Sequence, residues 1–151
     1  MIDLADNLVR QIGLLYRAMM KALETETAPF GVGSGRISYL FILYINEGLT
    51  QQEIANRLQA DKGAVARTLA QLEDQGYVNR KPDPADKRVT RVYLTDKSKA
   101  LQSDLEKAVE RVITRLNENI APDEEDVVKL QLKQMLGTLS AHYTPPRLKN
   151  Q

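Results

Sequence analysis

Cysteine is absent from this sequence of 151 residues, and there is a single histidine, His142. The lack of cysteine excludes disulfides, thiolate metal sites, cysteine nucleophiles and thiol redox sensors. One histidine also excludes a histidine-rich metal site within one chain, so we expect no metal and no other cofactor. No apolar run approaches the roughly 18 residues of a membrane-spanning helix, and the first residues do not resemble a signal peptide. We therefore expect a cytoplasmic protein that does not bind membranes.

The net charge is also small. The chain has 21 lysines and arginines and 20 aspartates and glutamates, which give a formal charge of +1. This balance alone does not favour a nucleic-acid partner. With 42% hydrophobic and 27% charged residues, the composition is that of a globular domain. The length is sufficient for one domain whose core needs no disulfide or metal.

The first third of the chain predicts two helices joined by a loop. Apolar residues three or four positions apart over 4–23 predict an amphipathic helix. One proline and three glycines within 24–35 predict a loop. A short apolar helix is expected over 37–46, and Gly48 stands where a glycine often ends a helix.

Two helix starts follow. Thr50 and Glu53 form a capping-box pattern, in which each side chain binds the other residue's backbone N–H, and this predicts a helix over 51–58. Asp61 is suited to cap a second helix over 62–75, which ends before a glycine. The apolar face of this second helix is formed by Val65, Leu69 and Leu72.

The periodicity then changes to that of strands. Residues 77–81 and 90–94 predict two short strands, and the proline-containing segment 82–86 predicts a turn between them. Thr95 can cap a long helix over 96–119. A last helix begins at a proline, whose missing N–H suits the first helical position, and has four acidic residues in its first turn.

This order of elements predicts a winged helix-turn-helix, in which the second of two short helices enters the DNA major groove and the turn between the strands forms a wing. We expect a mainly α fold with a small two- to three-stranded β wing. We divide the chain into an N-terminal dimerisation helix and loop (1–34), a DNA-binding lobe (35–95) and C-terminal dimerisation helices (96–151).

Local charge supports a wing that meets DNA. The segment from Tyr77 to Lys99 contains seven cations and three anions, a net charge of +4, so the remaining 128 residues sum to −3. Positive charge concentrated on one surface is typical of phosphate binding. The seven cations are Arg80, Lys81, Lys87, Arg88, Arg91, Lys97 and Lys99.

Within 49–95 the sequence resembles the MarR (multiple antibiotic resistance regulator) family. The resemblance lies in Leu-Thr-Gln-Gln-Glu-Ile-Ala at 49–55, Asp-Lys-Gly-Ala-Val-Ala-Arg at 61–67 and Leu-Glu-Asp-Gln-Gly-Tyr-Val-Asn-Arg at 72–80. The most specific part is Asp86-Lys87-Arg88 followed by Val-Tyr-Leu-Thr at 92–95, which is similar to the family's wing signature. The flanking helices agree with the family in length and order.

The resemblance implies roles for the wing residues. Arg88 corresponds to the arginine that reaches into the DNA minor groove, where negative potential attracts a guanidinium. Asp86 corresponds to the carboxylate that orients this arginine. The alternative is a solvated hairpin with an incidental ion pair.

Further DNA contacts are expected from the two short helices and the strands. Lys62 and Arg67 lie opposite the apolar face of their helix, where the alternative is a plain surface position. Gly63 and Ala64 replace the hydroxyl residues frequent in the family, so base reading there would use backbone N–H groups, methyl contacts or neighbouring side chains. For the two glutamines of the first short helix, a plain exposed face is the equally open alternative. The full expected set is Gln51, Gln52, Lys62, Gly63, Ala64, Arg67, Arg80, Lys87, Arg88 and Arg91.

The outer helices have apolar stripes that a winged helix of about 60 residues cannot cover. We expect them to form a twofold homodimer, as the family does, that reads a pseudo-palindromic DNA site. The alternative is a monomeric bundle folded back on itself. His142 is interpreted as an interface residue, and the expected interface is Leu8, Ile12, Leu116, Leu132, Met135 and Leu139.

The resemblance also implies a small, often aromatic or anionic, effector. An arginine can hold its carboxylate while aromatic rings stack on it. Ordinary core aromatics and one surface arginine are the alternative interpretation. The candidate residues are Tyr16, Arg17, Phe30, Tyr39 and Tyr44.

The predicted function is therefore that of a homodimeric, sequence-specific DNA-binding transcriptional regulator, a repressor released by a small ligand. A winged helix that binds only other proteins is the alternative, and the clustered cations argue against it. An enzyme is not expected, because the sequence has no cysteine, no phosphate-binding glycine loop and no histidine near a nucleophile and an acid.

Overall fold

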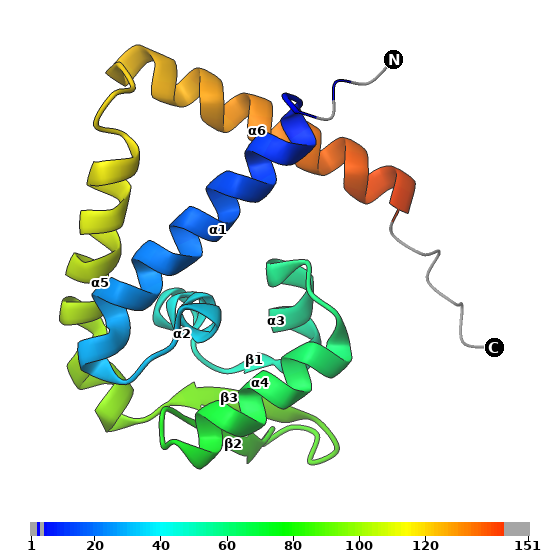
Figure 1. Ribbon diagram of the computed structural model, residues 1–151. Coiled ribbons are helices and arrows are strands. Elements are labelled where there is room, and N and C mark those ends of the chain that lie inside the picture. Colours follow the sequence, from blue (N-terminus) through cyan, green and yellow to red (C-terminus); the bar gives the residue numbers. More distant parts are fainter. Residues whose placement is uncertain (1–2, 4, 144–151) are drawn as a thin grey trace. The chain divides into compact units, whose positions relative to one another are not determined.

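The computed structural model describes residue 3 and residues 5–143, which divide into two compact units, 1–112 and 113–151 (Figure 1). The mainly α fold with a small sheet confirms the predicted fold class. The second unit contains the end of α5 and the helix α6 (Pro122–Tyr143). The first unit contains α1 (Leu8–Thr27), the 3-10 helix η1 (Ala28–Phe30), α2 (Ser34–Ile45), β1 (Leu49–Thr50), α3 (Gln51–Leu58), α4 (Lys62–Asp74), β2 (Val78–Pro82), β3 (Thr90–Leu94) and most of α5 (Asp96–Leu116).

The core of the first unit lies where α2, α3 and α4 gather beside the small sheet (Figure 1). Val65, Leu69 and Leu72 of α4 are fully buried there, as their spacing predicted. Burial of such side chains is the main favourable term in folding. The other large side chains that are fully buried at this core are Val32, Leu40, Leu43, Ile54, Val78, Val92 and Leu105.

The predicted starts of α3 and α4 are confirmed. Thr50 Oγ1 accepts from the N–H of Glu53 at 3.2 Å, while the Glu53 carboxylate accepts from the N–H of Thr50 at 2.7 Å. This is the complete capping box, and it satisfies N–H groups that have no partner within the helix. Asp61 Oδ1 accepts from the N–H of Ala64 at 3.0 Å and caps α4.

The end of α4 determines where β2 begins. Gly76 has φ of +73°, which favours glycine, and its N–H donates to the carbonyl of Glu73. The N–H of Tyr77 then donates to Leu72 at 2.8 Å, which completes a Schellman motif. Because Tyr77 closes the helix, β2 is Val78–Pro82 and lies one residue later than predicted.

The sheet has the order β1-β3-β2, and both pairings are antiparallel. Val78 pairs with Leu94 and Pro82 with Thr90, so β2 and β3 form the predicted hairpin, and β3 has its predicted bounds. β1 was not predicted from the sequence; it pairs Thr50 with Arg91. This short strand joins the start of α3 directly to the central strand of the sheet.

The predicted bounds of the first two helices were wrong by several residues. Asn7 caps α1, which continues to Thr27 through residues expected to be a loop; Leu4 lies outside the described residues. α2 begins at Ser34 and ends at Ile45 with an extended Asn46 as its cap. Gly48 does not cap this helix: its φ of +77° turns its N–H toward Val92 at 2.9 Å and starts the sheet.

The two later helices differ less from expectation. Thr95 Oγ1 accepts from the N–H of Ser98 at 3.3 Å and so serves the first turn of α5, as predicted. α5 ends at Leu116, three residues before its predicted end, while α6 begins at Pro122 as predicted. None of the helices that the structure describes is both long enough and apolar enough to cross a membrane.

Replacing Thr50 with alanine removes the acceptor for the N–H of Glu53. We expect the free energy of unfolding to fall by about 1 kcal/mol, measured by urea denaturation at fixed protein concentration. Thr25→Ala is the control, because the Thr25 hydroxyl donates to Lys21 inside α1 and caps no helix start; its change should stay within about 0.5 kcal/mol. Equal losses for the two variants would contradict the capping role.

Candidate nucleic-acid interface

α3 and α4 pack against each other, and one face of α4 is exposed to solvent. Lys62 and Arg67 are exposed on this face, and neither has an ion-pair partner among the described residues. Gly63 has no side chain to crowd its neighbours at the start of the helix. A Cβ at this position would lie 3.0 Å from the Asp61 carboxylate and 3.4 Å from Arg67 Nη1. The helix therefore offers two long cations beside a surface of small residues.

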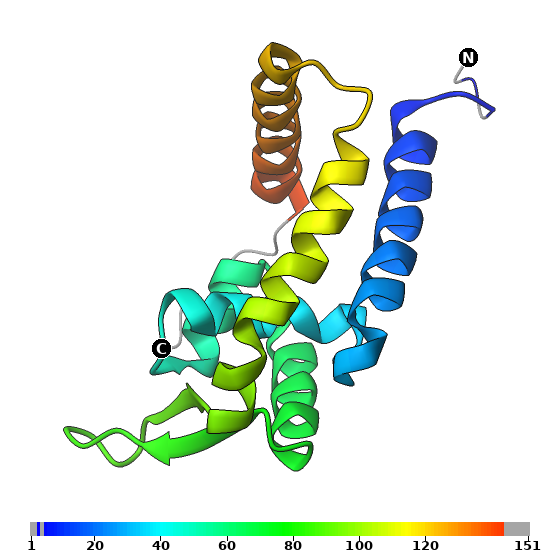
Figure 2. The same cartoon turned by 90° about the vertical axis from the view of Figure 1, so that its left-hand side faces the viewer.

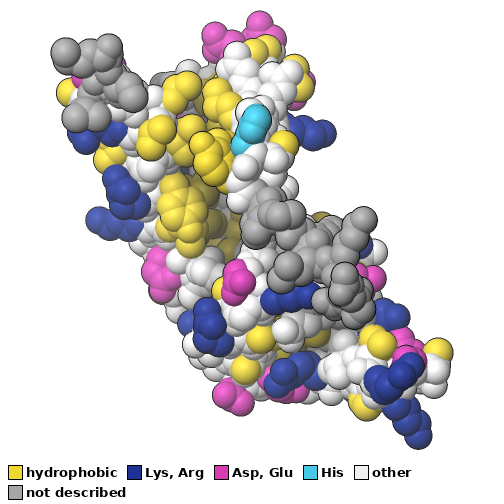
Figure 3. Space-filling model, turned by 90° about the vertical axis from the view of Figure 1, so that its right-hand side faces the viewer, with side chains coloured by type: hydrophobic (Ala, Val, Ile, Leu, Met, Phe, Trp, Pro, Cys, Tyr) yellow, Lys and Arg dark blue, Asp and Glu magenta, His cyan; other side chains and the backbone are white. Residues whose placement is uncertain are grey.

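The β2–β3 hairpin projects away from the helices as a wing (Figure 2). Backbone hydrogen bonds close its tip, from Asp83 to Val89 at 2.8 Å and from Val89 to Asp86 at 2.9 Å. Figure 3 shows lysine and arginine side chains, in dark blue, at this end of the molecule. The wing is thus a defined hairpin with a basic tip.

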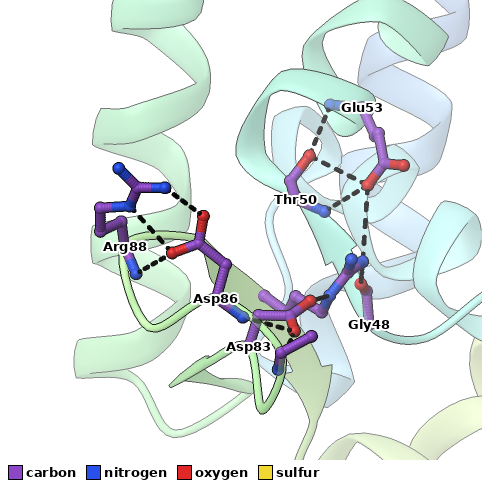
Figure 4. A network of polar contacts seen from close by, with 8 residues as sticks. Gly48, Thr50, Glu53, Asp83, Asp86 and Arg88 are labelled. Atoms are coloured by element: carbon purple, nitrogen blue, oxygen red, sulfur yellow. Dashed lines mark hydrogen bonds and ion pairs between the residues drawn. The ribbon is translucent and has the colours of Figure 1, made fainter.

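Arg88 is the most exposed of the arginines of the wing that form ion pairs, with 90% of its side chain accessible. Asp86 binds it through both carboxylate oxygens, at 3.0 Å to Nε and 3.0 Å to Nη2, and also accepts from its backbone N–H at 3.0 Å (Figure 4). The Arg88 guanidinium holds the pKa of Asp86 below its usual range. The pair has the geometry of a carboxylate that orients an outward-pointing guanidinium.

Two other arginines expected at the interface are bound within the protein. Glu73 of α4 accepts from Arg80 Nε at 2.7 Å, from Nη2 at 2.5 Å and from its backbone N–H at 3.1 Å. Arg91 binds Asp83 through Nε and donates from Nη1 to the Gly48 carbonyl at 2.8 Å. The charge of both guanidinium groups is therefore already partly satisfied.

The +4 charge of residues 77–99 is not all on the wing. Lys97 and Lys99 belong to α5, where Lys97 Nζ lies 4.0 Å from the centre of the Tyr77 ring and Lys99 pairs with Glu47 at 3.2 Å. On the wing itself, Lys81 lies over the Tyr93 ring at 5.7 Å. Lys87 is exposed and has no ion-pair partner among the described residues. The exposed positive charge of this segment is thus concentrated at the wing turn, over a smaller region than the sequence indicated.

The two glutamines of the expected set, Gln51 and Gln52, lie in the first turn of α3, where backbone N–H groups point outward. Gln52 Nε2 donates to Asn56 Oδ1 at 2.9 Å, so its amide is held along the helix. Ala64 lies in the corresponding turn of α4 and is partly exposed.

The candidate effector residues do not share one environment. Tyr39 is buried in the core, and Phe30 and Tyr44 pack against it. The Tyr44 hydroxyl donates to the carbonyl of Ser98 at 2.7 Å, and burial raises the pKa of Tyr44 to about 12. Tyr16 and Arg17 are exposed on α1. The three inner rings therefore have a packing role of their own, and effector binding stays a prediction.

Each unit leaves apolar side chains exposed, some of which are visible in yellow in Figure 3. In the first unit these include Leu8 at 63% and Ile12 at 43%. In the second unit no residue of α6 is buried, Met135 is half-buried and His142 is exposed. The large apolar residues exposed in the second unit are Ile113, Leu116, Val127, Val128, Leu130, Leu132, Leu136, Leu139 and Tyr143.

Sequence reasoning missed the partners of Arg80 and Arg91. Glu73 is seven residues from Arg80, and Asp83 is eight residues from Arg91 across the turn. Neither separation corresponds to a helical or strand neighbour: the first pair depends on the packing of β2 beside α4, and the second on the hairpin register. The available signal was an acidic residue in the predicted helix before the first strand, Glu73, and one in the predicted turn, Asp83, near strands whose charged residues are all basic.

The pKa of each carboxylate of the wing should be set mainly by its own arginine, although the charge of Asp83 slightly raises the pKa of Asp86. Arg91 and the N–H of Ala85 lower the pKa of Asp83, and Arg88 lowers that of Asp86. Because both pKa values are lower in the folded state than in the unfolded chain, both pairs stabilise the wing at neutral pH. That stabilisation is lost as the pH falls through the lowered values.

We expect Arg91→Leu to raise the pKa of Asp83 toward its ordinary value and to leave Asp86 nearly unchanged. Arg88→Leu should do the reverse. Carboxyl carbon NMR titrations of the two variants measure both values. A joint shift of both carboxylates in either variant would show that the two pairs form one coupled site.

Known proteins share this geometry. A family model described as MarR family matches residues 34–90. The HTH-type transcriptional regulator YybA of Bacillus subtilis (strain 168) is 29% identical over 94 residues, which are 62% of this chain. The match spans 63% of that protein, which is less than two thirds of its length.

Two solved structures extend the similarity over most of the chain. A mutant MarR from E. coli complexed with operator DNA is 27% identical, with a TM-score of 0.80, over 85% of this chain and 93% of its own. A MarR transcriptional regulator from Methanosarcina mazei Go1 is 31% identical, with a TM-score of 0.77, over 87% of this chain and 94% of its own. This chain therefore belongs to the MarR family of winged helix transcriptional regulators.

Proposed function

We propose that this protein is a sequence-specific DNA-binding regulator in which α4 enters the major groove and the wing contacts the adjacent backbone or minor groove. The main support is that Lys62 and Arg67 on α4 and Arg88 on the wing are all exposed in one compact unit. The related MarR of E. coli has been solved with operator DNA, which supports the same ligand here.

The available cations divide the interface into two kinds of contact. Lys87 and Arg88 at the wing tip suit phosphates or a narrow minor groove, where a guanidinium responds to potential rather than to base identity. Lys62 and Arg67 suit phosphates or base edges beside α4. Gly63 and Ala64 leave room for the helix to approach the bases closely.

The remaining contacts of the expected set are weaker candidates for direct DNA binding. Gln51 and Gln52 begin α3, where N–H groups and amides can bind a phosphate. Arg80 can reach DNA only by sharing or leaving its pair with Glu73. We assign these three residues to the edge of the interface.

Binding should depend steeply on salt. If about eight phosphates are contacted, the slope of log affinity against log salt should be near −7. Arg88→Ala should weaken binding and reduce the slope by about one, because one phosphate contact is lost. Electrophoretic mobility shifts on DNA selected with the purified protein measure both quantities.

Lys107→Ala is the matched control, because it removes one exposed positive charge from α5, outside the helix-turn-helix and the wing. It should leave the slope unchanged. Unchanged affinity of Arg88→Ala would contradict the wing assignment. Absence of any sequence-specific shift at low salt would instead favour a winged helix that binds only proteins.

We propose that the functional molecule is a homodimer. Apolar side chains exposed on α1, at the end of α5 and along α6 need a covering surface, and a second copy offers the same surfaces. A twofold dimer would present two α4 helices about 34 Å apart, one turn of DNA, and so read a pseudo-palindrome. The functional division is then 1–34 and 96–151 for dimerisation and 35–95 for DNA.

Leu132→Glu tests the dimer, because it places a carboxylate on an apolar side chain that is 46% exposed in the protomer. We expect the dimer dissociation constant to rise at least about tenfold, measured by sedimentation velocity over a dilution series. The neighbouring Gln131→Glu adds the same charge at an exposed polar position and should dimerise as the wild type does. Equal dimerisation of both variants would remove Leu132 from the interface.

We further propose that the bound dimer represses transcription by occupying promoter DNA, and that a small aromatic or anionic ligand releases it. Tyr16 and Arg17 are exposed on α1 and can stack on a ring and bind a carboxylate. Phe30, Tyr39 and Tyr44 would respond to such a ligand through packing. The absence of cysteine means that a thiol cannot be the sensor.

A further inference from the structure

Arg91 lies on β3 beside the wing turn, with its guanidinium turned toward the helix-turn-helix. Its Nε binds the Asp83 carboxylate, its Nη1 donates to the Gly48 carbonyl at 2.8 Å, and Nη1 also lies 3.9 Å from Glu53 Oε2. These partners come from the wing turn, from the loop before β1 and from the first turn of α3 (Figure 4). One side chain therefore connects the wing turn to the loop before β1 and the start of α3, which lie far earlier in the sequence.

Asp83 shapes the wing turn as well as binding Arg91. Its carboxylate accepts from the N–H of Ala85 at 2.7 Å and from that of Asp86 at 3.4 Å. Only 13% of the Asp83 side chain is exposed, against 42% for Asp86. The conformation of the turn and the Arg91 contact thus share a single, largely covered carboxylate.

Glu53 links Arg91 to the first turn of α3. The same oxygen, Oε2, accepts from the N–H of Thr50 at 2.7 Å and faces Arg91. Thr50 also pairs with Arg91 in the β1–β3 ladder. The cap of α3 and the part of β3 next to the wing turn are therefore joined through both backbone and side chains.

We propose that Arg91 is a positioning residue: together with Asp83 it fixes the wing against the start of α3, and it sets DNA affinity without contacting DNA. This role replaces the DNA contact expected from the sequence, because the Arg91 donors toward Asp83 and Gly48 are already used. The proposal rests on the proposed DNA-binding function.

The two roles of Arg91 predict opposite effects of Asp83→Asn. If Arg91 bound phosphate, loss of a competing carboxylate beside DNA would strengthen binding, because repulsion falls and the guanidinium is released. If Arg91 positions the wing, Asp83→Asn weakens binding although the protein becomes more positive. We expect about a tenfold loss of affinity for the selected DNA.

Arg91→Lys provides a second, independent distinction. A lysine keeps the charge needed at a phosphate, but a single ammonium cannot reproduce the planar fork that spans Asp83 and Gly48. We expect a loss similar to that of Asp83→Asn, with a salt slope equal to that of the wild type. Arg88→Ala, in contrast, should reduce the slope.

Asp74→Asn is the matched control, since it removes an exposed carboxylate from the end of α4 and should not weaken binding. Circular dichroism and the unfolding midpoint establish that each variant is folded. Because the chain has no cysteine, Ala85→Cys allows a single nitroxide on the wing turn. In the DNA-free protein, Asp83→Asn should increase the mobility of this label.

The outcomes separate the two claims. No binding by the wild type to any selected DNA would overturn the proposed function. Binding by the wild type with unchanged or tighter binding by Asp83→Asn would overturn only the positioning role. Weaker binding without increased wing mobility would also overturn it, because the loss would then not arise from a displaced wing.

Discussion

The central position of β3 is the constraint on which the rest of this structure depends. β3 pairs with β2 to form the wing and with β1 to bring the start of α3 to the same sheet. Its buried residues Val92 and Leu94 also join the core formed by the helices. The wing is therefore an extension of the core rather than a separate hairpin, which two strands alone would hold only marginally.

Several charged pairs of this chain stabilise the wing, and only the remaining exposed cations are available for the proposed DNA contacts. Glu73 satisfies Arg80, and Asp83 with Gly48 satisfies Arg91, so that these cations brace the two sides of the wing. Arg88 is paired too, but its carboxylate lies on the same turn and leaves the side chain outside. The paired cations stabilise the hairpin, and the hairpin presents the exposed cations to solvent. A protein of nearly zero net charge can thus have a small basic surface.

The outer helices pose a different physical problem from the winged helix. α3 and α4 bury one face completely, whereas α6 has no buried residue and exposes several leucines and valines in the protomer. A helix of 22 residues that exposes this many large apolar side chains is favourable only with a covering partner. The proposed homodimer accounts for these residues, and it also supplies the twofold arrangement that paired half-sites on DNA require.

Local signals in the sequence were sufficient for the capping box at Thr50 and Glu53, the Asp61 cap, the left-handed Gly76 and the bounds of β3, since each depends on residues close in the chain. They were also sufficient for the order of elements and hence the family. The length of α1, the turn at Gly48 and the strand β1 depended on tertiary contacts. The same holds for the division of the arginines into paired and exposed groups: Arg91 and Arg88 look alike in the sequence, and only the strand register brings one to Asp83 and Gly48 and leaves the other in solvent.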